Sequence, residues 1–347
     1  PKILSKSEAD ALSRSIDDAR RIVVVCHVAP DGDAIGSSLA LWHTLRGLGK
    51  DVFVVVPDAC PASLRFLNGY KDILVYTRYT EFAQQLLENA DLIFCLDFNE
   101  PKRVDKMEAA LTASKARKIL IDHHLHPAPF CNMTISHPEI SSTCEVLFRV
   151  ICSLGLFEQM GVDAASAIYT GMMTDTGNFT YNSNYPEIYI TIAELIKKGI
   201  DKDWIYARIH NTNSENKLRL NGYAIAQKME VFPEQCAALI TLSQNELNQY
   251  DYQKGDTEGL VNVPLSMEHI LFSAFLREES NLIKISLRSK GSFPANKLSS
   301  DYFNGGGHLN ASGGDVYATL HEAQCRILEI LQVMGELTNK SQTHQQL

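Results

Sequence analysis

The N-terminal part of the chain alternates short, continuous runs of apolar and β-branched residues with longer segments of helical periodicity. These runs predict strands at 21–26, 52–56, 92–96 and 118–121, separated by helices that include 34–48 and 79–89. Strands that are apolar throughout, rather than alternating with polar residues, are typical of a parallel sheet buried on both faces. The pattern therefore predicts an α/β fold, in which a largely parallel sheet is covered by helices.

The pattern changes further along the chain. Residues 142–220 are expected to be mostly helical, and the polar stretch 211–216 is the clearest candidate for a linker. After it we expect strands at 237–242, 282–287 and 315–318. A glycine-rich loop is expected to begin at 303–307, and a closing helix is expected at 321–337. A chain of 347 residues is too long for one ordinary core. We expect an N-terminal catalytic α/β domain at 1–195, a helical or loop linker at 196–225, and a smaller C-terminal α+β domain at 226–340.

Composition excludes several classes of protein. The net charge is −9, and proteins that grip long nucleic acid by its backbone usually have a basic face. None of the eight cysteines forms a C-x-x-C pair, which favours reduced, structural cysteines. We find no apolar stretch approaching the roughly 18 residues of a spanning helix and no signal-peptide pattern at the N-terminus. We therefore expect a cytoplasmic protein that binds neither long duplexes nor membranes.

Acidic and histidine residues follow three of the predicted strands, and a fourth cluster follows a helical run. The carboxyl ends of parallel strands meet at one edge of a sheet, so we expect these side chains to converge there. The candidate metal ligands are His27, Asp31, Asp33, Asp97, His123 and Asp175. Crowded carboxylates need cations to remain ionised, and histidine nitrogen with carboxylate oxygen suits Mn²⁺, Zn²⁺ or Fe²⁺. Six donors predict two metals about 3.5–4 Å apart that share a carboxylate and a water.

Each residue taken alone has a simpler interpretation. Asp33 and Asp175 each suit a helix cap or a turn, and a single histidine is more often structural than a ligand. The joint pattern of four clusters, most of them at strand ends, favours the metal site.

A second constellation lies in the C-terminal part and consists of Gly305, Gly306, Gly307 and His308. Glycines let backbone N–H groups approach an anion closely, and the histidine can donate to the same group. Upstream lie two arginines, whose guanidinium groups suit phosphate oxygens, and an asparagine in an expected turn: Arg277, Arg288 and Asn296. We expect phosphate binding here, although a tight turn with a surface histidine is the simpler alternative.

These residues together resemble a known family. His27-x-x-Pro-Asp31-Gly-Asp33-Ala-x-Gly36-Ser37, Asp97, Asp122-His123-His124 and Asp175 resemble the four motifs of the DHH phosphoesterase superfamily. Gly305-Gly306-Gly307-His308-x-x-Ala311-Ser-Gly313 resembles the signature of the DHH-associated C-terminal domain. Within the superfamily the chain is similar to the short, stand-alone nanoRNase A type.

The resemblance implies a role for each site residue. One Mn²⁺ would be held by His27, Asp31 and Asp97, and the other by Asp33, Asp97, His123 and Asp175, with Asp97 bridging. Among the catalytic residues, His124 would lie beside the attacking water or the scissile phosphate, and Asp122 would orient the histidine pair. Arg288 and His308 would bind the substrate phosphate, and Arg103 matches a basic position after the second motif.

The function implied is metal-dependent hydrolysis of short oligoribonucleotides and linear dinucleotides to mononucleotides, with phosphoadenosine phosphate as a further substrate. The substrate would lie in a cleft between the domains. A cyclic-di-AMP phosphodiesterase, a single-strand exonuclease and a non-catalytic nucleotide sensor are the alternatives. A homodimer is also implied by the resemblance alone.

Overall fold

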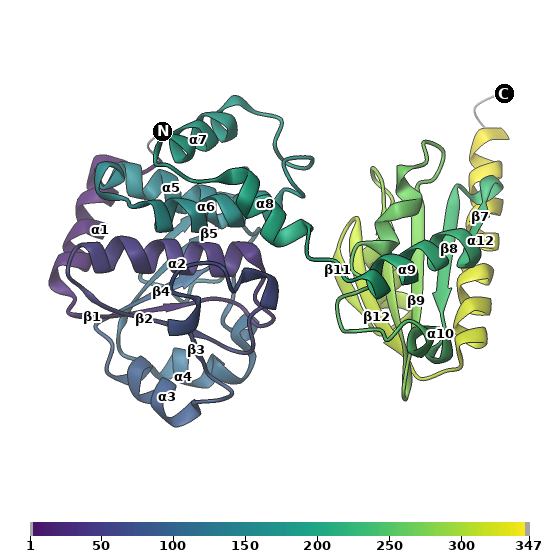
Figure 1. The fold of residues 1–347 in the computed structure, drawn as a ribbon, viewed down its shortest axis with the longest axis horizontal. Coiled ribbons are helices and arrows are strands. Elements are labelled where there is room, and N and C mark those ends of the chain that lie inside the picture. Colours follow the sequence, from purple (N-terminus) through teal and green to yellow (C-terminus); the bar gives the residue numbers. More distant parts are fainter. Residues whose placement is uncertain (1–2, 344–347) are drawn as a thin grey trace. The chain divides into compact units, whose positions relative to one another are not determined.

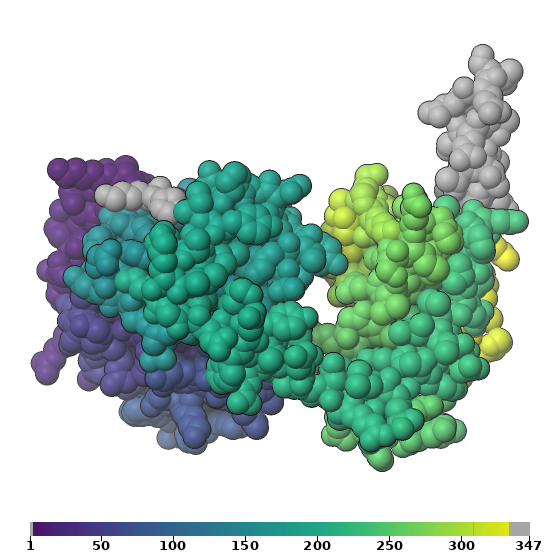
Figure 2. Space-filling model, turned by 45° about the horizontal axis from the view of Figure 1, so that its top comes forward, coloured from purple at the N-terminus to yellow at the C-terminus, as the bar shows by residue number. Residues whose placement is uncertain are grey.

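The computed structural model describes residues 3–343 (Figure 1), with the side chains of these residues except His308 and those after position 332. Contacts within the chain divide it into two compact units, Pro1–Thr212 and Asn213–Leu347. The division falls inside the segment 196–225 that the sequence suggests as a linker. The surface of each unit is built from its own run of sequence, purple to teal for the first and green to yellow for the second (Figure 2).

The first unit is built on a six-stranded parallel sheet with the order β3-β2-β1-β4-β5-β6. The strands are β1 (Arg21–Val25), β2 (Asp51–Val56), β3 (Leu74–Val75), β4 (Leu92–Leu96), β5 (Arg117–Asp122) and β6 (Met133–Ser136). The predicted α/β fold and its four predicted strands are confirmed. The two edge strands β3 and β6 were not predicted, because two and four residues are too short to show a hydrophobic period.

Helices cover both faces of this sheet. One face packs on α1 (Lys6–Asp18), α2 (Gly32–Gly47), α5 (Thr143–Ser153) and α6 (Val162–Asp175). The other packs on α3 (Thr80–Glu88) and α4 (Glu108–Ala113), as Figure 1 shows. Two further helices, α7 (Pro186–Lys197) and α8 (Lys202–His210), complete the unit. All five residues of β4 are buried, which explains why its sequence is apolar without alternation.

Glycines let α2 and α6 pack closely. A Cβ atom at Gly36 would lie 2.6 Å from the carbonyl oxygen of Ala167, and one at Gly171 would lie 2.2 Å from the Sγ atom of Cys144. Neither position has room for a side chain. This close approach brings the first turn of α2, with Asp33, beside the last turns of α6.

The second unit contains a mixed six-stranded sheet with the order β11-β12-β10-β9-β8-β7. Only the β8–β9 pair is parallel among these neighbours. The strands are β7 (Met229–Phe232), β8 (Ala237–Leu242), β9 (Phe272–Glu279), β10 (Leu282–Ser289), β11 (Gly306–His308) and β12 (Ala311–Val316). The helices are α9 (Glu215–Tyr223), α10 (Gln244–Gln249), α11 (Ala295–Tyr302) and α12 (Leu320–Thr343). No helix in the range 3–343 is long and apolar enough to cross a membrane.

The predicted glycine loop at 303–307 is wrong in its second half. Gly306 and Gly307 belong to β11, which pairs with β12 in an antiparallel hairpin. A Cβ atom at Gly305 would lie 1.9 Å from the carbonyl oxygen of Gly313, and Gly307 has a φ of 144°. These glycines are therefore required for close backbone packing. The strand expected at 315–318 also lies earlier, at Ala311–Val316.

Candidate metal centre

The predicted metal ligands meet at the carboxyl edge of the parallel sheet. The order of the strands reverses between β1 and β4, and ligands of open α/β sheets bind at such a reversal. Within residues 3–332, three groups of donor atoms lie within 4.8 Å of one another: His27, Asp31 and Asp97; Asp33, His123 and Asp175; and Asp97, His123 and His124. All six predicted ligands are included, and Asp97 belongs to two of the groups.

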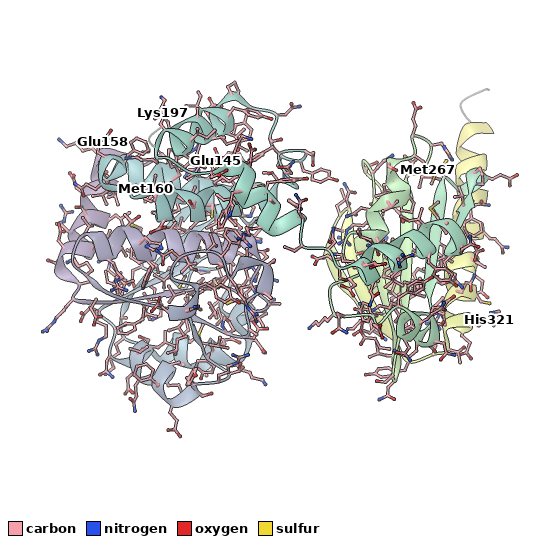
Figure 3. The ribbon with its side chains drawn as sticks, in the orientation of Figure 1. Glu145, Glu158, Met160, Lys197, Met267 and His321 are labelled. Atoms are coloured by element: carbon pink, nitrogen blue, oxygen red, sulfur yellow. The ribbon has the colours of Figure 1, made fainter. Side chains whose placement is uncertain are left out.

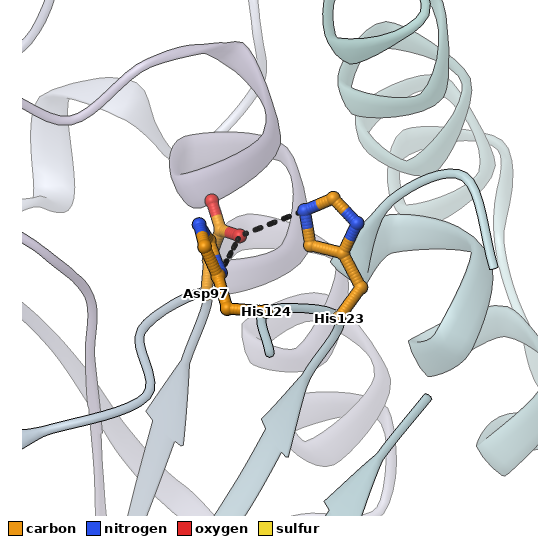
Figure 4. A group of neighbouring side chains, drawn as sticks. All are labelled: Asp97, His123 and His124. Carbon is orange, nitrogen blue, oxygen red and sulfur yellow. Dashed lines mark ion pairs between the residues drawn. The ribbon is translucent and has the colours of Figure 1, made fainter. Parts of the chain in front are cut away.

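Asp97 belongs to two of these groups, and Figure 4 shows its carboxylate facing both His123 and His124. Its Oδ2 atom is 3.4 Å from Nε2 of His27, and its Oδ1 atom is 3.8 Å from both Nε2 of His123 and Nδ1 of His124. It follows β4 directly, is 2 % exposed, and has a φ of 65°. This left-handed conformation is unfavourable for most residues and tolerated by aspartate. The turn thus aims both carboxylate oxygens at different histidines.

His27 and Asp31 form one side of the centre. The Nδ1 atom of His27 is 2.7 Å from the carbonyl oxygen of Val28, which leaves Nε2 available as a metal ligand. This Nε2 atom is 3.8 Å from Oδ1 of Asp31. Asp31 also caps α2, because its Oδ1 atom accepts hydrogen bonds from the backbone N–H groups of Asp33 and Ala34.

His123 and Asp175 form the opposite side. The Nδ1 atom of His123 is 3.3 Å from the carbonyl oxygen of Ile140, so its Nε2 atom faces the cluster. That atom lies 3.6 Å from Oδ2 of Asp175 and 4.0 Å from Oδ2 of Asp33. Asp175 is the last residue of α6, where the helix dipole disfavours negative charge. A cation at this position would offset that cost.

Asp33 is buried and held by the start of α5. Its Oδ2 atom accepts a hydrogen bond of 2.7 Å from the backbone N–H of Thr143, and Oδ1 accepts one of 2.8 Å from Cys144. The hydroxyl of Thr143 donates to Oδ1 of Asp97 at 2.9 Å. The N-terminus of α5 therefore fixes both Asp33 and Asp97, and a helix N-terminus favours negative charge of this kind.

The electrostatics of the cluster match a site built for cations. Burial, together with the charges of Asp97, Asp175 and Asp31, raises the pKa of Asp33 well above its usual range. Burial also raises the pKa of Asp175 to about 6, against the opposing effect of His123. Bound divalent cations would restore the charged form of both carboxylates. The nitrogen and oxygen donors present therefore fit divalent metal ions.

Asp122 and His124 form a pair beside this cluster. The Nδ1 atom of His124 is 2.8 Å from Oδ1 of Asp122, which is fully buried. Burial alone would lower the pKa of His124, but the hydrogen bond to Asp122 and the charge of Asp97 raise it. The positive charge of Arg103, an exposed residue, lowers the pKa of the same histidine and so opposes this increase.

The residues that position the start of α5 are not among the site residues predicted from the sequence. Glu145 (Figure 3) is buried and accepts hydrogen bonds from Ser141, Tyr185 and Arg149. It holds the helix turn whose Thr143 contacts the two aspartates. The signal was present in the sequence: a serine three residues before a glutamate, ahead of an apolar run, indicates a helix N-terminus.

In the second unit, Arg277, Arg288 and Gly305 line one cavity of about 630 Å³. Arg288 makes no ion pair with a carboxylate within residues 3–332; its Nη1 atom donates to the carbonyl oxygens of Leu287 and Ser312. Burial lowers its pKa, and nearby Glu258 acts in the opposite direction.

Arg277 is already partnered. Its Nη2 atom donates to Glu279 at 2.5 Å, and its guanidinium lies over the ring of Tyr252 and donates to that hydroxyl. Of the other predicted substrate residues, Asn296 lies in the first turn of α11, away from the cavity lining, and its side chain accepts from the backbone N–H of Lys297. The side chain of His308 lies outside the described residues.

Comparison with known proteins places the two units in context. The family model "DHH family, N-terminal domain" matches residues 21–172, and the "DHHA1 domain" model matches residues 235–337. A solved structure described as an exopolyphosphatase-related protein from Bacteroides fragilis is 53% identical and has a TM-score of 0.94, covering 97% of this chain and 99% of that one.

Characterised relatives cover nearly the full chain as well. The bifunctional oligoribonuclease and PAP phosphatase NrnA of Thermus thermophilus is 30% identical over 91% of this chain and 90% of its own length. The protein of the same name from Bacillus subtilis is 27% identical over 88% and 93%. The cyclic-di-AMP phosphodiesterase PdeA of Listeria monocytogenes is 24% identical over 95% of this chain, which spans only 50% of that protein. The chain therefore belongs to the DHH family, with an N-terminal DHH domain followed by a DHHA1 domain.

Proposed function

We propose that this chain is a metal-dependent phosphoesterase that hydrolyses short oligoribonucleotides and linear dinucleotides to mononucleotides, with two Mn²⁺ ions as cofactors. The position of Asp97, whose two oxygens face different sets of donor atoms, carries this proposal. Two relatives that match nearly the whole chain are named oligoribonuclease and PAP phosphatase, which supports short nucleotides as the substrate class.

The ligand sets follow from the three donor groups. His27, Asp31 and Asp97 would hold one ion, while Asp33, His123 and Asp175, with the second oxygen of Asp97, would hold the other. Ions bound in this way supply a Lewis acid for the phosphate oxygens and lower the pKa of a water molecule.

The proposed role of His124 is that of a proton and hydrogen-bond donor. Its Nδ1 atom is engaged by Asp122, so Nε2 is the atom that can face a substrate phosphate or leaving oxygen. The raised pKa keeps the ring protonated to higher pH than an ordinary histidine. Asp122 acts through His124 by fixing its orientation, and Arg103 adds a positive charge close by.

The second unit would supply the binding of the rest of the substrate. We assign the phosphate contact to Arg288, because its guanidinium lines the cavity and has no carboxylate partner within residues 3–332. Arg277, held by Glu279, would shape that cavity rather than bind phosphate directly. Gly305, Gly306, Gly307 and His308 complete the proposed phosphate contacts, and Asn296 remains a proposed substrate residue on α11.

Three other substrates are alternatives with a specific observation behind each. The names of the NrnA relatives favour phosphoadenosine phosphate. The likeness to PdeA favours cyclic di-AMP, although the chain spans only half of that protein. The description of the Bacteroides fragilis structure favours polyphosphate. The homodimer also remains a prediction.

The test is a parallel assay of purified protein with Mn²⁺ and with a chelator. The substrates are the linear dinucleotide pApA, a five-residue RNA, a twenty-four-residue RNA, phosphoadenosine phosphate, cyclic di-AMP and polyphosphate. We expect Mn²⁺-dependent loss of pApA and of the five-residue RNA, with slow loss of the longer RNA. Turnover of cyclic di-AMP or polyphosphate alone would replace the proposed substrate, and turnover in the chelator would contradict the metal mechanism.

A further inference from the structure

A cavity of about 380 Å³ lies in the first unit, apart from the ligand cluster described above. It is formed by the segment that follows β2 and includes the short helix η2 (Tyr70–Asp72) and strand β3. Its lining includes three cationic side chains with an aromatic and an aliphatic surface beside them: Arg65, Lys71, Arg78, Tyr70, Ile73 and Val75.

The cations of this cavity have no carboxylate ion-pair partner in the described part of the chain. No acidic residue lines it, and within residues 3–332 none of Arg65, Lys71 and Arg78 forms an ion pair with a carboxylate. The chain as a whole has a net charge of −9, so three cations around one cavity without carboxylate partners run against its average. Because like charges repel at short range, an anion would stabilise this arrangement.

The wall of the cavity is fixed by local hydrogen bonds. The hydroxyl of Tyr70 donates to the carbonyl oxygen of Cys60 at 3.0 Å. Burial raises the pKa of the Cys60 thiol to about 12, an effect to which Asp58 contributes. The thiol is therefore neutral at physiological pH and places no negative charge against an incoming anion.

The same segment is hydrogen-bonded to the loop that carries two of the candidate metal ligands. The Oδ1 atom of Asp58 accepts a hydrogen bond of 2.7 Å from the backbone N–H of Ala29. Ala29 lies between His27 and Asp31 in the loop that follows β1. Because β1 and β2 are neighbouring parallel strands, both loops leave the same edge of the sheet. The segment that forms the cavity therefore begins at the same carboxyl edge of the sheet as the loop that carries His27 and Asp31.

We propose that this cavity is a second phosphate-binding site, which takes a phosphate group of a nucleotide. Two guanidinium groups and an ammonium group suit phosphate oxygens. The ring of Tyr70 and the aliphatic chains of Ile73 and Val75 offer an apolar surface to the sugar or base. That the anion belongs to a nucleotide rests on the function proposed above, whereas the phosphate site rests on the cavity alone.

The test compares two double variants that remove equal charge from the full-length chain. R65Q/R78Q removes two cations from the cavity, and R20Q/K115Q removes two exposed cations elsewhere on the first unit whose side chains form no ion pair within residues 3–332. Calorimetric titration with AMP in the presence of Mn²⁺ measures binding directly. KM and kcat for pApA and for a five-residue RNA measure any contribution to substrate binding.

We expect R65Q/R78Q to lose one AMP-binding event, or to weaken it about tenfold, while R20Q/K115Q binds as the wild type does. A parallel increase of about tenfold in KM for the five-residue RNA, with kcat and pApA unchanged, identifies the anion as a distal phosphate of the substrate. An unchanged KM identifies it as a separate nucleotide.

Identical AMP binding by the two double variants would overturn the proposal, whatever the enzyme hydrolyses. The AMP titration does not depend on turnover. Failure of the phosphate site is therefore distinguishable from failure of the proposed function.

Discussion

Replacing Gly171 by alanine tests how helix packing positions the metal ligands. A Cβ atom at this position would lie 2.2 Å from Sγ of Cys144, 2.9 Å from Oδ1 of Asp33 and 3.1 Å from its Cα atom. The first two distances are far below van der Waals contact. Cys144 and Asp33 are both buried, and the backbone N–H of Cys144 donates a hydrogen bond to Oδ1 of Asp33. Neither residue can therefore move away freely.

The magnitude follows from two opposing effects. Alanine is favoured over glycine inside a helix by about 1 kcal/mol, and overpacking of a tight core costs about 1–3 kcal/mol. The difference is a net destabilisation of up to about 2 kcal/mol, which corresponds to a decrease in Tm of up to a few degrees. Displacement of Asp33 should also weaken metal binding about tenfold, because one ligand of the set is moved.

The matched control is Gly47→Ala. Gly47 is the last residue of α2, and a Cβ atom there would meet nothing within 4 Å. This variant should be as stable as the wild type or slightly more so, with unchanged metal affinity. Thermal unfolding and calorimetric titration with Mn²⁺ measure both quantities. If Gly171→Ala matched Gly47→Ala in both, the close contact would not position Asp33 and the reasoning would be wrong.

Three further outcomes are expected. Thr143→Val removes the hydroxyl that donates to Asp97, so kcat should fall at least tenfold with a modest loss of stability of about 1 kcal/mol; a kcat equal to the wild-type value would contradict the role. Asp122→Asn weakens the hydrogen bond and removes the charge by which Asp122, together with Asp97, raises the pKa of His124. A raised pKa keeps the His124 ring protonated to higher pH, so the alkaline limb of the pH–kcat profile should move to lower pH in this variant. An unmoved limb would contradict the role of Asp122 in keeping His124 protonated. Glu246 has its pKa lowered to about 2: burial alone would raise it, but bonds from Ser243, Tyr223 and Lys228 lower it. A depressed pKa contributes stability above the ordinary value of 4.5 that is lost as pH falls towards 2, so Glu246→Gln should cost about 1–3 kcal/mol at pH 7 and little at pH 2 by chemical denaturation.

The first sheet and the convergence of the candidate metal ligands were accessible from the sequence because they depend on local patterns. A run such as 92–96 is buried on both sides, and every position in it is apolar, so the strand and its place in a largely parallel sheet could be predicted. The carboxyl ends of such strands meet by geometry alone. The sequence alone therefore predicts that Asp97 and the His123–His124 pair converge.

The missed features depend on tertiary contacts. Nothing in the local sequence of Thr143 shows that its N–H and hydroxyl contact two aspartates far away in the chain. The glycines at 305–307 suggested an anion-binding loop, but the lack of a side chain at Gly305 and at Gly307 serves close backbone packing against β12. The cations around the cavity beside β3 are spread over a segment without a recognisable motif. Only the fold brings Arg65 and Arg78 together.

The central claim is that Asp97 is shared by two metal ions, and the metal content of the purified chain tests it most directly. Wild-type protein and the Asp97→Asn variant, equilibrated with Mn²⁺ and freed of excess metal, would be compared by elemental analysis and calorimetric titration. We expect two Mn²⁺ per wild-type chain, and weaker binding of both ions with loss of hydrolysis in the variant, because each ion loses the shared ligand. One ion per wild-type chain, or two tightly bound ions in Asp97→Asn, would contradict the account.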